Sequence, residues 1–285
     1  MNVAALLQSI NEQHGTVFEL LERYSSGEQG AFAIADQGGK RYVLKWEADD
    51  GPLDRLKEVS LITQALRKVE YPAPRYCFLG NVQGYSYTIQ EALPGAPMGV
   101  VTVQLLPRLL KLNELQAGLA ASEQSDWPRP VVDTVMEGGD GYCILDSLRI
   151  YSSTTAELLH MLQGVVLARR NEQFETNDVV HFDFNPSNIL IENGQVSGVI
   201  DWEGTCAGDC TFDLATLLFY AYDALDVREH LLLAIWERVS PDILNVYMAH
   251  MILRQVDWSI RHHNRATVDY YLRVAENVLR DIGGK

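Results

Sequence analysis

The chain has 285 residues, of which 47% are hydrophobic and 21% charged, and its formal net charge is −15. This length can bury a substantial core, in one large domain or in two lobes. No run of about 18 apolar residues predicts a membrane span, and no basic stripe predicts nucleic-acid binding. The cysteines are scattered, as is typical of a cytoplasmic protein, and the sequence indicates no obligate protein partner.

The first 92 residues predict a β-rich segment with two helices. Apolar residues at positions 3, 6, 7 and 10 have the spacing of one helix face. A second helix is expected over 52–69, where Pro52 is a favoured first helical residue. Strands are expected where strand-forming residues alternate with glycine-containing turns. These strands cover residues 18–29, 30–37, 40–48, 76–82 and 85–92, the last two joined at Gln83-Gly84.

The pattern becomes mainly helical after "LPGAP" at residues 93–97. We therefore predict an N-terminal lobe over 1–92, a linker over 93–97 and a helical C-terminal lobe over 98–285. The helices expected in the second lobe cover residues 101–121, 155–172, 211–225, 227–238, 241–262 and 266–281.

Negative charge is concentrated in the second lobe. Residues 1–92 carry 9 basic and 12 acidic side chains, whereas residues 93–285 carry 14 and 26. An acidic surface often serves solubility alone. The alternative is an electrostatic field that attracts a cationic small molecule into a cleft.

A hairpin is predicted on either side of Asn193-Gly194, because this dipeptide between two apolar runs favours a type I′ turn. Counting back along both strands places Asn188 opposite Val199. Asp201 then lies one diagonal step away, near the same end of the hairpin.

Three oxygen-bearing side chains are thereby expected at one end of this hairpin. Asp183 precedes Asn188 by five residues, on the loop that leads into the strand, and Asp201 follows the second strand. Carboxylate and amide oxygens suit a hard divalent cation such as Mg²⁺, with the remaining carboxylate as a separate base. The alternative is a loop stabilised by Asx-turns and helix caps.

These residues also carry a family resemblance. "HFDFNPSNIL" followed by "GVIDWE" resembles the catalytic loop and the metal-binding aspartate of the aminoglycoside phosphotransferase and choline kinase family. "GDCTFDLATLL", "YVLKW" and "YTIQEALPG" resemble further segments of that family. The resemblance implies an α+β, two-lobed, protein-kinase-like fold, with a small β-rich N-terminal lobe and a larger, mainly helical C-terminal lobe.

The resemblance also implies the roles of individual residues in a Mg²⁺-dependent kinase that uses ATP or GTP. Asp183 would accept or orient the proton of the attacking hydroxyl group, and Asn188 and Asp201 would hold Mg²⁺. Lys45 would contact the α- and β-phosphates, and Glu58 on the following helix would pair with its ammonium group.

Further contacts to the nucleotide are implied by the same resemblance. Gly27 and Gly30 belong to a loose phosphate-covering loop, and Glu91 and Leu93 to the hinge that meets the base. Two more residues are expected to support the loop rather than react: His181 would brace it, and Asp213 would brace it or cap a helix.

The resemblance implies a small-molecule acceptor, and the acidity of the second lobe favours a cationic one. An aminoglycoside-type antibiotic is then the leading candidate, in a resistance enzyme. Trp258 could add a cation–π contact. The candidate acidic contacts are Glu203, Asp223, Asp226 and Asp257. Two alternatives stay open: a metabolic kinase acting on choline, a sugar or an amino alcohol, and a nucleotide-binding pseudokinase without activity.

Overall fold

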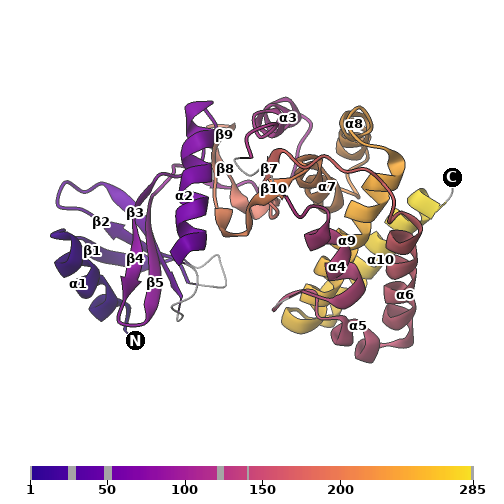
Figure 1. The fold of residues 1–285 in the computed structure, drawn as a ribbon, viewed down its shortest axis with the longest axis horizontal. Helices are drawn as coiled ribbons and strands as arrows, with labels where there is room; N and C mark the ends of the chain where they lie inside the picture. The colour runs from indigo at the N-terminus through magenta and orange to yellow at the C-terminus, as the bar shows by residue number, and fades with distance from the viewer. Residues whose placement is uncertain (1, 25–29, 48–52, 121–124, 140, 284–285) are drawn as a thin grey trace. The chain divides into compact units, whose positions relative to one another are not determined.

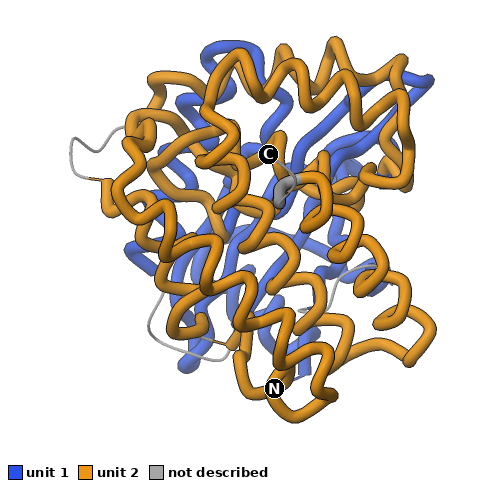
Figure 2. The backbone as a smooth tube through the Cα atoms, turned by 90° about the vertical axis from the view of Figure 1, so that its right-hand side faces the viewer, with its two compact units in different colours: residues 1–97, 189–203 blue, residues 98–188, 204–285 orange. Residues whose placement is uncertain are grey.

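The computed structural model describes residues 2–24, 30–47, 53–120, 125–139 and 141–283. The chain forms two compact units (Figure 2). Unit 1 consists of residues 1–97 and 189–203, and unit 2 of residues 98–188 and 204–285.

Unit 1 is built on a five-stranded antiparallel sheet with the strand order β1-β2-β3-β5-β4 (Figure 1). Its elements are α1 (Val3–His14), β1 (Glu19–Arg23), β2 (Phe32–Ala35), β3 (Arg41–Glu47), α2 (Leu53–Lys68), β4 (Tyr76–Val82) and β5 (Tyr85–Glu91). The two helices and five strands predicted for this segment are confirmed in place, but the strand expected over 18–29 is much shorter and ends at Arg23. Residues 25–29 and 48 of the predicted strands lie outside the described residues. Pro52, the expected first residue of α2, lies outside the described residues.

Helix α1 covers one face of this sheet. Its three buried apolar residues pack in one cluster with Leu44 of β3 and Ile89 of β5. Side chains alternate between the two faces of a strand, so Lys45 of β3 and Gln90 of β5 lie on the opposite face. That second face therefore carries polar groups, among them Lys45, which is predicted to contact the nucleotide phosphates.

A smaller sheet in unit 1 contains the predicted hairpin. Its strands lie in the order β6-β8-β9, with bounds β6 (Ala96–Pro97), β8 (Ile189–Glu192) and β9 (Gln195–Val199). Asn193 and Gly194 at the turn have φ angles of 51° and 76°. Positive φ at both positions is what a type I′ turn requires, so this prediction is confirmed.

The predicted register of the hairpin is wrong by one residue at its open end. The sequence predicts Asn188 opposite Val199, whereas Val199 pairs with Ile189. A β-bulge causes the shift, because Ser197 has no partner in the register. The Ser197 hydroxyl donates to the carbonyl oxygen of Pro94 at 2.6 Å, which ties the bulge to the linker.

The hairpin belongs to unit 1 by its contacts, although the predicted division places it within the C-terminal lobe over 98–285. The reason is the pairing of β6 with β8, in which Ala96 lies opposite Ile191. Gly95 allows this close approach, since its φ is +104° and a Cβ there would lie 2.7 Å from the Ile191 oxygen. The predicted lobe boundaries stay a prediction.

Unit 2 is mainly helical and contains a two-stranded sheet of β7 and β10 (Figure 1). Its elements are α3 (Leu106–Glu114), α4 (Arg129–Glu137), α5 (Leu145–Tyr151), α6 (Ser153–Ala168), β7 (Asp178–Val180), β10 (Cys206–Gly208), α7 (Thr211–Tyr220), α8 (Leu225–Trp236), α9 (Pro241–His262) and α10 (Arg265–Gly283). Helix α9 is largely buried and packs against α4, α5, α6, α7 and α10. It is the central helix of this unit.

The helices predicted for residues 155 onward are confirmed with altered ends, but the one expected over 101–121 is much shorter. It ends at Glu114, because Asn113 and Gln116 turn inward to bond the carbonyl oxygens of Cys210 and Val179. The short helices α4 and α5 are not predicted by the sequence. No helix in the described part of the chain is long and apolar enough to cross a membrane.

Candidate active site

Lys45 on β3 lies between two carboxylates of the segment that follows β9. Its Nζ donates to Asp201 Oδ1 at 2.6 Å and to Glu203 Oε1 and Oε2 at 3.0 and 3.1 Å. Gln90 Nε2 donates to Glu203 Oε1 at 3.2 Å. Burial lowers the pKa of Lys45, but Glu203 and Asp201 raise it more, so the net pKa is well above its ordinary value. The ammonium group therefore stays charged.

The prediction that Glu58 pairs with Lys45 is wrong for this structure. Glu58 Oε2 accepts from Arg55 Nη1 at 2.7 Å, and the Glu58 side chain is 59% exposed. Glu203 takes the place expected for Glu58, because it lies two residues after Asp201 and reaches the same face of the sheet. Glu203 is therefore engaged by Lys45, and its predicted role as an acceptor contact is not supported.

Asp201 has an unusual backbone conformation, with a φ of 71°. A non-glycine residue in this region costs of order 1–3 kcal/mol and is typical of functional sites. The adjacent Trp202 holds the segment in place. It is fully buried, its Nε1 donates to the Val199 oxygen at 2.8 Å, and its ring packs edge-on against Tyr71.

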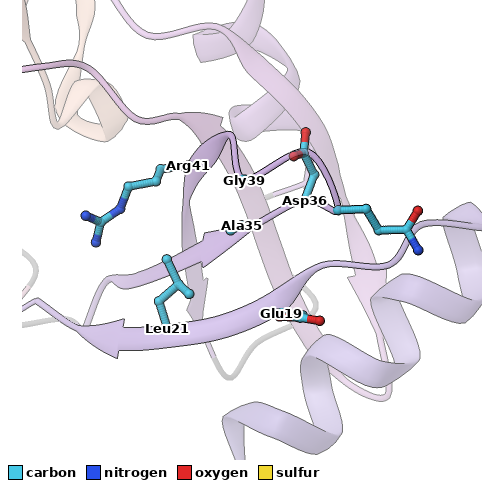
Figure 3. Close-up of a pocket in the computed structure, with 7 residues that line it drawn as sticks. Glu19, Leu21, Ala35, Asp36, Gly39 and Arg41 are labelled. Carbon is cyan, nitrogen blue, oxygen red and sulfur yellow. The ribbon is translucent and has the colours of Figure 1, made fainter.

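A hollow of about 620 Å³ opens on the outer strands of unit 1. Figure 3 shows Leu21, Ala35 and Arg41 from three neighbouring strands around it. Ala35 pairs with Arg41, and Arg41 precedes Lys45 by four residues on the same strand. The hollow therefore lies on the same face of the sheet as the Lys45 ammonium group.

The remaining residues predicted to contact the nucleotide are two glycines of the covering loop and two residues of the hinge. Gly27 lies outside the described residues, and Gly30 has a φ of 74°. Glu91 forms an ion pair with Lys40 at 2.6 Å, and the Leu93 side chain lies against Gly198. Their contacts with a nucleotide stay predictions.

In unit 2, Asp213 holds the backbone of the loop that precedes Asp183. Its Oδ2 accepts the His181 N–H at 2.8 Å and its Oδ1 the Phe182 N–H at 3.0 Å, while Gln116 Nε2 donates to Oδ2 at 2.7 Å. Burial raises the pKa of Asp213 to about 7, and these hydrogen bonds oppose the rise. Of the two predicted roles, the structure supports loop bracing.

The backbone at Phe182 is strained and packed. Its φ is 71°, and its ring stacks on Phe212 with a centroid distance of 5.1 Å and lies edge-on to His250 at 5.6 Å. His181, predicted to brace this loop, is buried, and its Nδ1 accepts the Asp183 N–H at 3.2 Å. The loop is therefore held at His181, before Phe182, and at Asp183, after it.

The Asp183 carboxylate accepts hydrogen bonds from three side chains. Oδ1 accepts from Arg254 Nη2 at 2.6 Å and Asn185 Nδ2 at 2.8 Å, and Oδ2 accepts from Asn188 Nδ2 at 2.9 Å. The Asp183 side chain is 28% exposed. A carboxylate oxygen can accept about two hydrogen bonds, so Oδ2 retains the capacity to accept one from a hydroxyl group.

Asn188 and Asp201 each carry an oxygen donor of the kind that a magnesium ion prefers. Asn188 Nδ2 donates to the backbone oxygen and to Oδ2 of Asp183, both at 2.9 Å, and this orientation leaves the amide oxygen as the atom offered to a cation. Asp201 contributes a carboxylate. Two hard oxygen donors are what Mg²⁺ prefers from a protein. Asn188 belongs to unit 2 and Asp201 to unit 1, and their joint role as ligands stays a prediction.

Asp257 is buried, so its predicted contact with an acceptor ammonium group is wrong for this structure. It accepts from Arg261 Nη2 at 2.8 Å and from the Ser147 hydroxyl at 2.5 Å. A buried carboxylate needs such partners within the protein. Asp223 and Asp226, in contrast, are exposed at the start of α8, and their contacts with an acceptor stay predictions.

Arg254 contacts Asp183 in the candidate site, although the sequence does not predict a role for it. It is separated from Asp183 by 71 residues, and it lies in α9, whose apolar sequence pattern predicts only packing. No local motif marks it.

We expect His250 to make the folded protein less stable in acid. Burial and the nearby Arg254 lower the pKa of His250 to about 3, below the ordinary value of about 6.5. The neutral imidazole is therefore favoured in the folded state. Its contribution to stability is full above pH ~6.5 and is lost as the pH falls toward ~3, with a slope of up to about 1.4 kcal/mol per pH unit.

Urea unfolding at several pH values between about 6.5 and 4 measures this effect. The His250→Gln variant should show a shallower acid loss of unfolding free energy than the wild type, and His230→Gln on the surface of α8 is the control. An unchanged pH slope in His250→Gln would contradict the expectation.

Comparison with known proteins places the chain in a family. The sequence model of the phosphotransferase enzyme family matches residues 21–243. Hygromycin-B 4-O-kinase of Escherichia coli is 24% identical over 226 residues, which are 73% of this chain and 64% of that protein. The chain thus spans less than two thirds of this relative's length. Homoserine kinase of Gluconobacter oxydans (strain 621H) is 33% identical over 89 residues, 31% of this chain and 26% of that protein.

The fold also matches a solved structure. A thermostable mutant of aminoglycoside phosphotransferase APH(4)-Ia, in a ternary complex with AMP-PNP and hygromycin B, aligns with a TM-score of 0.74. The identity is 19%, and the match covers 98% of this chain and 99% of that one. The predicted α+β, protein-kinase-like fold is confirmed. Because the family model spans most of the sequence, the chain belongs to the phosphotransferase enzyme family.

Proposed function

We propose that this protein transfers the γ-phosphoryl group of ATP or GTP to a hydroxyl group of a cationic small molecule, with Mg²⁺ as cofactor. The observation that carries the proposal is the position of Asp183. Its carboxylate is fixed by Arg254, Asn185 and Asn188 within a braced loop, yet it remains partly exposed and keeps one oxygen able to accept a proton.

The chemistry follows from these contacts. A bond forms between the acceptor oxygen and the γ-phosphorus, the bond from that phosphorus to the β,γ-bridging oxygen breaks, and the hydroxyl proton passes to Asp183 Oδ2. Phosphoryl transfer has a loose transition state, so most of the catalysis is positioning and neutralisation of charge. Because positioning dominates in such a reaction, Asp183 contributes by orienting the hydroxyl group as well as by accepting its proton.

The nucleotide side of the proposal rests on Lys45. Its ammonium group is charged and held by Asp201 and Glu203, and it would turn an N–H from these carboxylates to a phosphate oxygen when a nucleotide binds. Asn188 and Asp201 would hold Mg²⁺, which supplies positive charge to the phosphates when bound. The likeness to a structure that contains AMP-PNP supports this assignment.

For the acceptor, we propose an aminoglycoside antibiotic of the hygromycin type. The relative that aligns over most of this chain is a hygromycin-B kinase, and residues 93–285 carry 26 acidic against 14 basic side chains. Such a charge balance favours a polycation over a neutral molecule. With Glu203 held by Lys45 and Asp257 buried against Arg261, the exposed Asp223 and Asp226 are the remaining candidates for ammonium contacts.

A second candidate function is a metabolic kinase acting on an amino alcohol. The observation that favours it is the homoserine kinase relative, which has the higher identity but covers a much shorter segment. The acceptors of the two candidate functions differ in charge. The dependence of kcat/KM on salt concentration can therefore distinguish them.

The acceptor class can be tested by a nucleotide-turnover screen at saturating Mg-ATP over hygromycin B, other aminoglycosides, homoserine, choline and a neutral sugar. We expect turnover of an aminoglycoside, with kcat/KM falling roughly tenfold or more between 0.01 M and 0.1 M NaCl. The Debye length shortens over this range from about 30 Å to about 10 Å. Turnover of homoserine with little salt dependence would instead establish the metabolic kinase.

The Asp183→Asn variant tests the catalytic assignment. It keeps the size of the side chain but removes its charge and its ability to take the proton, so kcat should fall by about 10²–10⁴-fold. Affinity for Mg-nucleotide, measured by calorimetric titration, should change little. Turnover near the wild-type rate would exclude Asp183 from catalysis, and a wild type that binds nucleotide without any turnover would indicate a pseudokinase.

The variants Glu203→Gln and Glu58→Gln together test which carboxylate supports Lys45. Glu203→Gln removes a charge-assisted hydrogen bond to Lys45, worth about 1.5–3 kcal/mol, and should weaken Mg-nucleotide binding by about 10–100-fold. Glu58→Gln should change the dissociation constant by less than about twofold, because an exposed ion pair contributes little. The reverse order of effects would restore Glu58 as the partner of Lys45.

A further inference from the structure

Arg254 of α9 is bound to both residues at the tip of the catalytic loop. Its Nη2 donates to Asp183 Oδ1 at 2.6 Å, and its Nη1 donates to the Phe182 carbonyl oxygen at 2.8 Å. The guanidinium carbon lies 6.0 Å from the centroid of the Phe182 ring. One rigid planar group thus holds a strained backbone and the carboxylate next to it.

We propose that Arg254 is a positioning residue, which orients the Asp183 carboxylate so that Oδ2 faces the acceptor hydroxyl group. This inference rests on the proposed phosphotransferase function. The guanidinium group presents its N–H donors in a fixed planar arrangement, which loses little freedom when two of them bind. Since Arg254 and Asn185 both donate to Oδ1, rotation of the carboxylate would break two bonds. Oδ2 accepts from Asn188 and keeps the capacity for one more hydrogen bond, from the substrate.

A second arginine on the same helix, Arg261, forms a buried ion pair that serves as a structural comparison for Arg254. Arg261 holds Asp257, whose side chain is completely buried and also accepts from Ser147. The two arginines are similarly exposed, at 23% and 22%, but Asp183 is 28% exposed. Arg254 therefore pairs with a carboxylate that a substrate can reach, whereas Arg261 pairs with one that it cannot.

The position of Arg254 also matters for charge. The guanidinium group compensates the charge of the Asp183 carboxylate, whose side chain is only 28% exposed. Helix α9 packs against five other helices of unit 2, so the guanidinium group is carried on a rigid support. Both effects act on the reacting geometry rather than on affinity, because the contacts of Arg254 are with protein groups.

The test uses Arg254→Lys, Arg254→Met and the control Arg261→Lys in the full chain, with the melting temperature of each variant measured alongside its kinetics. Lysine keeps the charge but loses the planar pair of donors, and methionine loses both. We expect kcat to fall about tenfold in Arg254→Lys and about 100-fold in Arg254→Met, with both KM values within about threefold of the wild type. Arg261→Lys should keep kcat within about twofold of the wild type. This should hold even if its melting temperature falls as far as that of Arg254→Lys.

Three results would overturn the inference: an unchanged kcat in Arg254→Lys, a rise in KM without loss of kcat, or an equal loss of kcat in Arg261→Lys. Arg254→Lys carries the test if Arg254→Met does not fold. A wild-type chain that binds Mg-nucleotide but phosphorylates no acceptor would overturn the proposed function, and the inference with it. An active wild type with an insensitive Arg254 would overturn the inference alone.

Discussion

The buried carboxylate of Asp213 is the contact on which the geometry of the candidate site in unit 2 depends. It accepts the backbone N–H groups of His181 and Phe182, and so holds the chain in the left-handed conformation found at Phe182. Asp183 follows directly. Strain of this kind persists only where neighbouring groups over-determine it, and here the stacked ring of Phe212 and the guanidinium group of Arg254 supply the additional contacts.

Charge compensation is the second organising feature of the molecule. Lys45 lies between Asp201 and Glu203, Arg254 pairs with Asp183, and Arg261 with Asp257. The first two pairs involve partly exposed groups that a substrate can reach, whereas the third is closed within unit 2. A charge away from water requires a partner, but only a partner that leaves one atom accessible can also support chemistry.

The acceptor assignment depends on a different kind of argument. The acidity of residues 93–285 is a property of the whole surface, and a field of this kind attracts cations without selecting one. Selection of one cationic acceptor requires contacts with particular side chains. The structure removes Glu203 and Asp257 from the set of free carboxylates, because Glu203 is paired with Lys45 and Asp257 with Arg261. The relatives then supply the two acceptor classes worth comparing, an aminoglycoside and an amino alcohol.

The sequence by itself determined the features that depend on few neighbouring residues. The apolar spacing of α1, the Asn193-Gly194 turn and the H-x-D-x-x-x-x-N spacing around Asp183 all identify local structure, because helix period, turn chemistry and loop motifs are encoded over short segments. Tertiary structure alone decided the partners. Lys45 and Glu203 are 158 residues apart, and Asp183 and Arg254 are 71 apart. The bulge at Ser197 and the burial of Asp257 likewise follow from packing against other segments. Periodicity reports which face of an element is apolar, but which distant charge a side chain meets is set only when the elements pack.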